Sequence, residues 1–156
     1  MDFQEKINMW GTDPFPVSFF TICYDRRSRE NWKRKSDEKF STVGKTLPHW
    51  HRHQEVILVE TGKIRFTINS FKGEAAEGDF LVINGMDTHS LVGDGTVRVA
   101  QFDSNLKRDF KCPSKMRFNL QDQDKLIQKD SCCYEQIYRE FNEAREAFMN
   151  ENKDYY

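Results

Sequence analysis

Residues 15–102 are divided into short apolar runs by Gly, Asn and Asp, and this division constrains the fold more than any other feature. In the clearest run, Ile64, Phe66 and Ile68 alternate with polar or charged residues. Alternation with a period of two predicts a strand with one buried face. Residues 80–83 are continuously apolar, which indicates a strand buried on both faces. A series of short strands with turns between them predicts a β-sandwich or a β-barrel.

The size and charge of the chain limit what it does. It has 156 residues, a length typical of one domain, and its 24 basic and 25 acidic residues give a net charge of −1. A free-standing nucleic-acid-binding domain needs an excess of Lys and Arg, so we expect no direct DNA contact by this chain. No apolar run reaches the roughly 18 residues that span a bilayer, and the first residues lack the apolar region of a signal peptide. We therefore expect a cytoplasmic protein with no membrane partner. Its cysteines are expected to be reduced thiols, and they are Cys23, Cys112, Cys132 and Cys133.

The hydrophobic period changes after Pro113. Apolar residues recur there every three or four positions, which predicts an amphipathic helix. The apolar stripe consists of Tyr134, Ile137, Tyr138, Phe141, Ala144 and Phe148. Asp130 and Ser131 are the expected N-cap residues, and no Gly marks the C-terminal end, so we expect the native chain to continue beyond Tyr156. The stripe packs either on the β-domain or on a second copy of the chain.

Three of the four histidines lie within residues 48–62. If this segment is an extended strand, alternate residues share a face that points into the interior. The polar residues on that face are His49, His51, His53 and Glu55. Buried imidazoles and a carboxylate are costly unless they are hydrogen-bonded, contact a ligand or coordinate a cation. The fourth histidine, His89, is expected to approach the others from across the barrel.

The spacing alone leaves the ligand set open. His51, His53 and Glu55 share one face of the expected strand, and by spacing they are as suitable a ligand set as the set that begins with His49. A metal site, a metal-free polar pocket for a small effector and a purely structural hydrogen-bond network are all compatible with these side chains. Strand parity also places Gln101 and Tyr24 near the interior, but it assigns neither a role.

The order of these residues resembles the two motifs of the cupin family. The first motif, His-x-His-x3-Glu-x6-Gly, is carried by His49, His51, Glu55 and Gly62. Gly78, followed after ten residues by His89, is similar to the second motif. Residues 47–102 as a whole are most similar to the amino-terminal sensor domain of AraC-type transcription regulators. The chain departs from the enzyme form of the second motif, which has Pro, Gly and Asn at the positions of Asn84, Met86 and Gly93.

The resemblance implies a mainly β fold, the double-stranded β-helix or jelly-roll-like cupin barrel, with a C-terminal α-helical segment. It places an N-terminal extension at residues 1–14, the barrel at residues 15–111 and a helical dimerisation segment at residues 112–156. In AraC-type regulators the barrel binds an effector, the following helices form a homodimer, and a separate C-terminal helix-turn-helix domain binds DNA. This sequence contains no such domain, so DNA is expected to be contacted only by a part of the protein outside it.

The resemblance also implies a ligand set. Carried over residue by residue, it predicts that a divalent transition metal, such as Zn, Ni, Fe, Mn or Cu, is held by His49, His51, Glu55 and His89. His53 joins these four residues in the predicted effector pocket. The predicted function is small-molecule sensing, with no catalytic residue assigned. The alternatives are a small metal-dependent cupin enzyme of the oxygenase or isomerase type and a plain structural or storage cupin.

Overall fold

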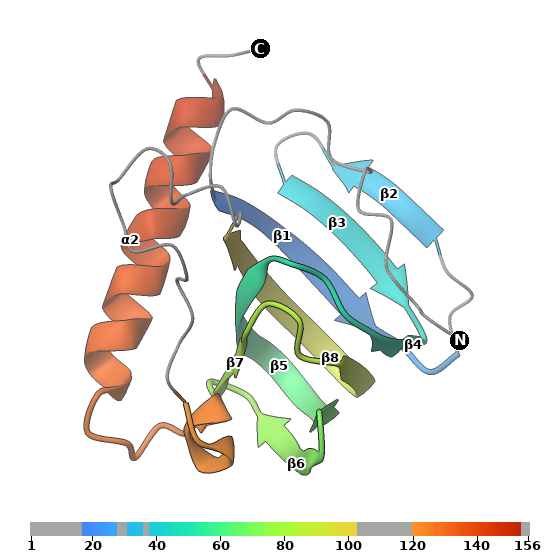
Figure 1. The fold of residues 1–156 in the computed structure, drawn as a ribbon. Coiled ribbons are helices and arrows are strands. Elements are labelled where there is room, and N and C mark those ends of the chain that lie inside the picture. The colour runs from blue at the N-terminus through green and yellow to red at the C-terminus, as the bar shows by residue number, and fades with distance from the viewer. Residues whose placement is uncertain (1–16, 28–30, 36–37, 103–119, 154–156) are drawn as a thin grey trace.

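The computed structural model describes residues 17–27, 31–35, 38–102 and 120–153 (Figure 1). Its strands are β1 (Val17–Tyr24), β2 (Asn31–Lys35), β3 (Glu38–Val43), β4 (Lys45–His49), β5 (Gln54–Ile68), β6 (Phe71–Ala76), β7 (Phe80–Ile83), β8 (His89–Phe102) and β9 (Leu126–Ile127). A short 3-10 helix, η1 (Asp122–Lys125), precedes β9, and the helix α2 (Tyr134–Lys153) follows it. The predicted fold class, a mainly β barrel followed by a C-terminal helix, is confirmed.

The two longest strands, β5 and β8, form the centre of the sheet. They pair antiparallel along their lengths, from Gln54 opposite Phe102 to Ile68 opposite His89. The hydrogen-bonded order is β2-β3-β1-β8-β5-β7-β9, with β4 added to β8 and β6 added to β5. The barrel is therefore built around one long pair of strands, and both predicted site motifs lie on that pair or next to it.

Residues 54–59 of β5 and residues 97–102 of β8 are buried or half-buried on both faces. The inner face contributes to the barrel core, in which Ile57, Val59 and Val99 are almost fully buried. On the outer face, Leu58 and Ala100 belong to a second apolar cluster that includes residues of α2. The alternation predicted at Ile64, Phe66 and Ile68 lies in the second half of β5, and residues 80–83 are buried at every position of β7, as expected.

The strand β5 changes partner at a bulge. Its residues 55–58 pair with β7 and its residues 63–68 pair with β6, and the register to β8 shifts between Val59 and Thr61. Gly62 follows the bulge with a φ of 77°, in the left-handed region that favours glycine. A Cβ atom at Gly62 would lie 2.1 Å from the carbonyl oxygen of Asp94. The glycine of the first predicted motif is therefore required by backbone geometry.

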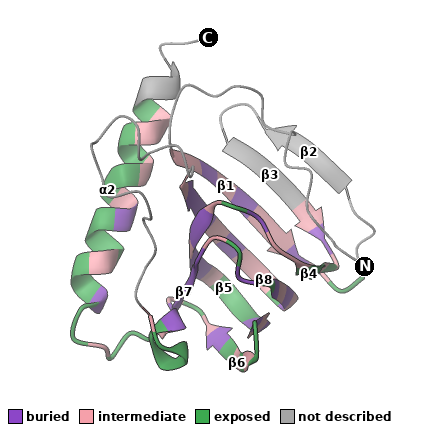
Figure 2. Cartoon of the chain, viewed as in Figure 1, coloured by how far each residue is buried: buried purple, intermediate pink, exposed green. Residues whose placement is uncertain are grey.

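The helix α2 packs on the outer face of the barrel (Figure 2). Phe80 lies at the centre of this contact, with its ring 5.4 Å from Phe141 and 5.9 Å from Tyr134, and Phe19 contacts Phe141 and Phe148. The chain's own barrel thus covers Tyr134 and Phe141 of the predicted apolar stripe, whereas Tyr138, at 43% exposure, and Ala144 are exposed. A homodimer through this segment stays a prediction.

Two boundary predictions differ from the structure or lie outside it. The helix begins at Tyr134, not directly after Asp130 and Ser131, because residues 129–133 form a turn in which Tyr134 N–H donates to the carbonyl of Ser131. The predicted boundaries at 14/15 and 111/112 lie outside the described residues.

Three of the four cysteines lie in the described part of the chain. Cys23, Cys132 and Cys133 are free thiols, as expected, whereas Cys112 lies outside the described residues. Within the described part of the chain, no helix combines the length and the apolar character needed to cross a membrane.

Candidate metal centre

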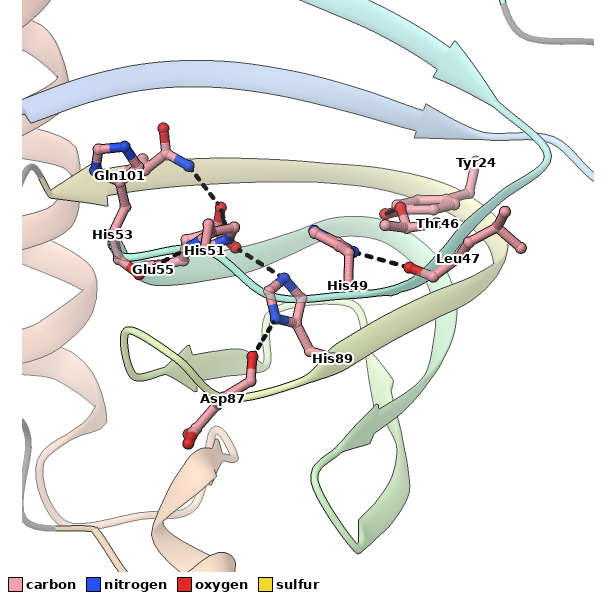
Figure 3. A network of polar contacts seen from close by, with 10 residues as sticks. All are labelled: Tyr24, Thr46, Leu47, His49, His51, His53, Glu55, Asp87, His89 and Gln101. Atoms are coloured by element: carbon pink, nitrogen blue, oxygen red, sulfur yellow. Dashed lines mark hydrogen bonds and ion pairs between the residues drawn. The ribbon is translucent and has the colours of Figure 1, made fainter. Parts of the chain in front are cut away.

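Three histidines meet at one end of the barrel interior (Figure 3). His49 ends β4, His51 lies in the bend that follows, and His89 begins β8, directly opposite His49 in the sheet register. One ring nitrogen from each of the three lies within 4.8 Å of the others. His51 and His89 are buried, and His49 is half-buried. Sheet pairing and a short bend therefore bring together residues that are 40 positions apart in the sequence.

Each of these histidines is oriented by a backbone carbonyl two residues away in the chain. The Nδ1 atoms of His49, His51 and His89 lie 2.8 Å, 3.0 Å and 2.9 Å from the carbonyl oxygens of Leu47, His53 and Asp87, respectively. A carbonyl oxygen only accepts hydrogen bonds, so each Nδ1 carries the proton and donates it. The Nε2 atom of a neutral ring then keeps its lone pair. This is the way in which metal-binding histidines are held in the correct tautomer.

Glu55 places its carboxylate next to two of the imidazoles. Its Oε1 atom lies 3.2 Å from Nε2 of His51, and its Oε2 atom lies 3.7 Å from Nε2 of His89. Gln101 donates a hydrogen bond from its Nε2 atom to Oε1 of Glu55, at 3.0 Å. Glu55 and Gln101 are both buried, and they face each other across β5 and β8.

The electrostatics of the cluster keep Glu55 ionised and His89 neutral. Burial alone would raise the pKa of Glu55, but the attraction of His51 and a hydrogen bond to it, with smaller contributions from His89 and His49, lower that pKa to about 2. The pKa of His89 is lowered to about 4, because burial disfavours its charged form more strongly than Glu55 favours it, and His49 and His51 add to the lowering.

The donor set fits a divalent transition metal. Three imidazole nitrogens and one carboxylate suit Zn, Ni, Fe, Mn or Cu, whereas Ca and Mg prefer sites made of oxygen atoms. A neutral His51 also points a lone pair at a carboxylate oxygen 3.2 Å away, an arrangement that needs a positive charge between the two atoms. A proton or a metal ion supplies that charge. The four residues of the predicted ligand set are thus brought together with compatible chemistry.

The expectation of one unbroken strand is wrong, whereas a place for His53 in the effector pocket stays a prediction. Residues 48–62 are not one strand, because β4 ends at His49 and the chain bends at residues 51–53 before β5 begins at Gln54. The ring of His53 lies 6.0 Å from that of His51 and outside the group of three. Its Nδ1 atom is buried without a hydrogen-bond partner among the described residues. Of the two registers, the structure brings His49 rather than His53 to His51 and His89.

Two polar residues near the cluster have a clear role only in the structure. Gln101 was placed near the interior by strand parity, but its contact with Glu55 depends on the register of β5 and β8. Lys125 is buried, and its Nζ atom lies 3.2 Å from Asp122 and 3.7 Å from Asp87, whose carbonyl orients His89. No sequence signal indicated Lys125, because it follows residues 103–119, whose path no local pattern predicts.

A match to a protein family agrees with this architecture. Residues 39–115 match the Cupin_2 family, whose description is "Cupin domain". No curated protein is significantly similar in sequence. Similar solved structures include an RmlC-like cupin from Shewanella frigidimarina NCIMB 400, with 20% identity and a TM-score of 0.34 over 37% of this chain and 53% of that chain. KdgF from Halomonas sp. is 21% identical with a TM-score of 0.36, over 38% of this chain and 57% of that chain.

A third similar structure is oxalate decarboxylase from Bacillus subtilis, which is 17% identical with a TM-score of 0.37 over 55% of this chain and 30% of that chain. The matched segments thus span a little over half of the RmlC-like cupin and of KdgF, and less than a third of oxalate decarboxylase. The family match assigns residues 39–115, which carry the four predicted ligands. Residues 39–115 are therefore similar to a cupin domain, and the barrel described above is compatible with that match.

Proposed function

We propose that this chain is the small-molecule-sensing domain of an AraC-type transcription regulator in the cytoplasm, and that a divalent metal forms part of its ligand site. The observation that carries the metal centre is the common orientation of three imidazoles, each with Nδ1 bound to a carbonyl. His49, His51, Glu55 and His89 would hold the ion. When bound, a divalent ion acts as a Lewis acid and attracts an oxygen atom of a small ligand.

The protein contributes orientation and exclusion of water. Backbone carbonyls fix the rings of His51 and His89, and Gln101 fixes the carboxylate of Glu55. These side chains are buried among the apolar residues of the barrel, where a charge-assisted contact to a ligand is stronger than in water. The ligand that fits this site is small and carries a carboxylate or hydroxyl oxygen.

The path from the site to α2 supports the sensing role. Asp87 orients His89 through its carbonyl, and the carboxylate of Asp87 lies near Lys125 of η1. The strand β9 follows η1 directly and pairs with β7, and the chain then continues into α2. A ligand that favours one arrangement of the loop at Asp87 would therefore also favour one arrangement of the segment that leads to α2.

Metal content tests the centre. The protein is purified without an affinity tag or a chelator, and bound metal is measured by mass spectrometry in the wild type, His51→Ala and His89→Ala. His53→Ala is the matched control, because His53 lies in the same bend but outside the group of three. We expect stoichiometric metal in the wild type and the control and its loss in the other two variants. A folded, metal-free wild type would refute the centre and leave a metal-free effector pocket.

Hydrogen exchange tests the sensing role separately. Zn²⁺ is added to the metal-free protein, and amide exchange is followed over residues 120–153. We expect slower exchange in this segment for the wild type and no change for His89→Ala. Unchanged exchange in a wild type that binds Zn²⁺ would contradict sensing through α2, while the metal centre would stand.

A metal-dependent enzyme is the second candidate, and the half-buried position of His49 favours it. Closed structural metal sites are shielded on all sides, whereas a catalytic site keeps a position open for substrate. The test incubates the Fe²⁺- and Mn²⁺-loaded protein with a panel of small carboxylic and hydroxy acids and analyses them for conversion. If the protein is only a sensor, each acid should be recovered unchanged. Conversion of an acid by the wild type that is lost in His89→Ala would establish the enzyme.

A further inference from the structure

The side-chain amide of Gln101 donates a hydrogen bond to the carboxylate of Glu55. We propose that Gln101 is a positioning residue that holds the carboxylate of Glu55 toward His51 and His89, and that it thereby sets metal affinity. This inference rests on the proposed metal centre and assigns a role to a residue outside the predicted ligand set. It is carried by the hydrogen bond between the two side chains and by their place in the sheet.

The contact is fixed by strand pairing and not by a mobile loop. Glu55 lies at the beginning of β5 and Gln101 near the end of β8, and the two residues are direct partners in the antiparallel register. Neighbouring residues on both strands are also paired, with Gln54 opposite Phe102 and Val56 opposite Ala100. Both side chains are buried, at 6% and 7% exposure. A buried cross-strand pair of this kind has few alternative rotamers, so the orientation of the carboxylate is well defined.

The chemistry of the pair assigns the direction of the hydrogen bond. An ionised carboxylate only accepts, so the amide of Gln101 must present its N–H to Oε1 of Glu55. This bond occupies one lone pair of Oε1, the oxygen that also lies 3.2 Å from His51. The other oxygen, Oε2, is turned toward His89. With Oε1 held in this way, the carboxylate keeps its orientation toward the two imidazoles.

A neutral donor is suited to this task. An Arg or Lys at position 101 would form a stronger bond with Glu55, but it would also cancel the negative charge that attracts a divalent ion. The amide orients the carboxylate and leaves its charge available to the metal. Loss of such an outer-shell partner typically weakens metal binding by roughly 10-fold to 100-fold.

Cobalt binding tests the role of Gln101. Metal-free wild type, Gln101→Leu and Gln101→Asn are titrated with Co²⁺, whose visible absorption reports coordination number and geometry. We expect both variants to bind Co²⁺ roughly 10-fold to 100-fold more weakly, with an altered absorption spectrum. Asn keeps the polar amide but is one methylene too short, so it should show the effect even if the Leu variant folds poorly. Gln54→Leu is the matched control, since Gln54 is an equally buried glutamine that points to the other face of β5.

The same titration in a Glu55→Ala background separates positioning from a general structural effect. If Gln101 acts through Glu55, Gln101→Leu should cause no further change in affinity or spectrum once the carboxylate is gone. An equal loss in both backgrounds would overturn the inference, and so would wild-type affinity and spectrum in both Gln101 variants. A wild type that binds no Co²⁺ would instead refute the proposed metal centre itself, and the role of Gln101 with it.

Discussion

The strands β5 and β8 carry two very different groups of buried side chains on their two faces. On the outer face, Leu58 and Ala100 pack against Phe80 and the rings of α2, and this group needs only apolar contact. On the inner face, Glu55 and Gln101 meet two buried histidines at the end of the apolar core. The outer group is complete without a further component, whereas the inner group places lone pairs and a carboxylate together. The first group stabilises the fold, and the second brings together side chains that could hold a cation.

The largest expected effect is on the outer face. Phe80 is fully buried and its ring contacts Tyr134, Tyr138 and Phe141. We expect Phe80→Ala to lower the free energy of unfolding by about 3–5 kcal/mol, because it removes a large buried ring and leaves a cavity. Urea unfolding measures the loss. The folded fraction should bind as much metal per molecule as the wild type, and a specific loss of metal binding would break the distinction between the two faces.

Acidification should destabilise the inner face of the metal-free protein. The pKa of His89 falls from about 6.5 in the unfolded chain to about 4 in the folded protein, so below pH 6.5 the unfolded chain takes up a proton that the folded protein does not. Stability is therefore lost as pH falls from 6.5 to 4, by about 3 kcal/mol from this group. The lowered pKa of Glu55 adds a further loss between pH 4.5 and about 2.

Urea unfolding at pH 7 and pH 4 measures the difference, with His89→Ala as the comparison. We expect this variant to lose less stability between the two pH values than the wild type does. Equal losses in the two proteins would show that the pH dependence arises elsewhere.

Metal bound at the inner face should stabilise the folded protein as a whole. With free Zn²⁺ at 100 times its dissociation constant, we expect the free energy of unfolding to rise by about 2.7 kcal/mol. The gain should be lost in His89→Ala and kept in His53→Ala. A gain that survives in His89→Ala would place the bound ion away from the cluster.

The smallest expected effect concerns the polar anchor of α2. The hydroxyl of Tyr134 donates to the carbonyl of Gly78 at 2.7 Å, and burial raises the pKa of Tyr134, so the hydroxyl keeps its proton. Tyr134→Phe should cost about 0.5–1.5 kcal/mol of stability, the usual contribution of one hydrogen bond. Metal affinity should change far less than in His89→Ala, because the substitution leaves the four predicted ligands and the contact of Asp87 with Lys125 in place. A loss of metal binding as large as that of His89→Ala would contradict this expectation.

Local patterns predicted most of the fold and part of the site. The alternation around Ile64 and Phe66 and the apolar run at 80–83 predict strands because burial imposes a period on the sequence. Strand parity assumed an unbroken strand and could not show the bend at residues 52 and 53, after which His53 lies outside the group of three histidines. The role of Gln101 depends on the register of two strands more than 40 residues apart, and no single segment records that register.

The most direct test of the central claim is the protonation state of the histidine rings when Zn²⁺ is bound. Long-range ¹H–¹⁵N NMR correlations distinguish Nδ1 from Nε2 in each ring. The account predicts that His49, His51 and His89 carry the proton on Nδ1, and that their Nε2 signals shift when Zn²⁺ is added while those of His53 do not. Protonated Nε2 atoms in these three rings, or Nε2 signals that do not shift when Zn²⁺ is added, would contradict this prediction.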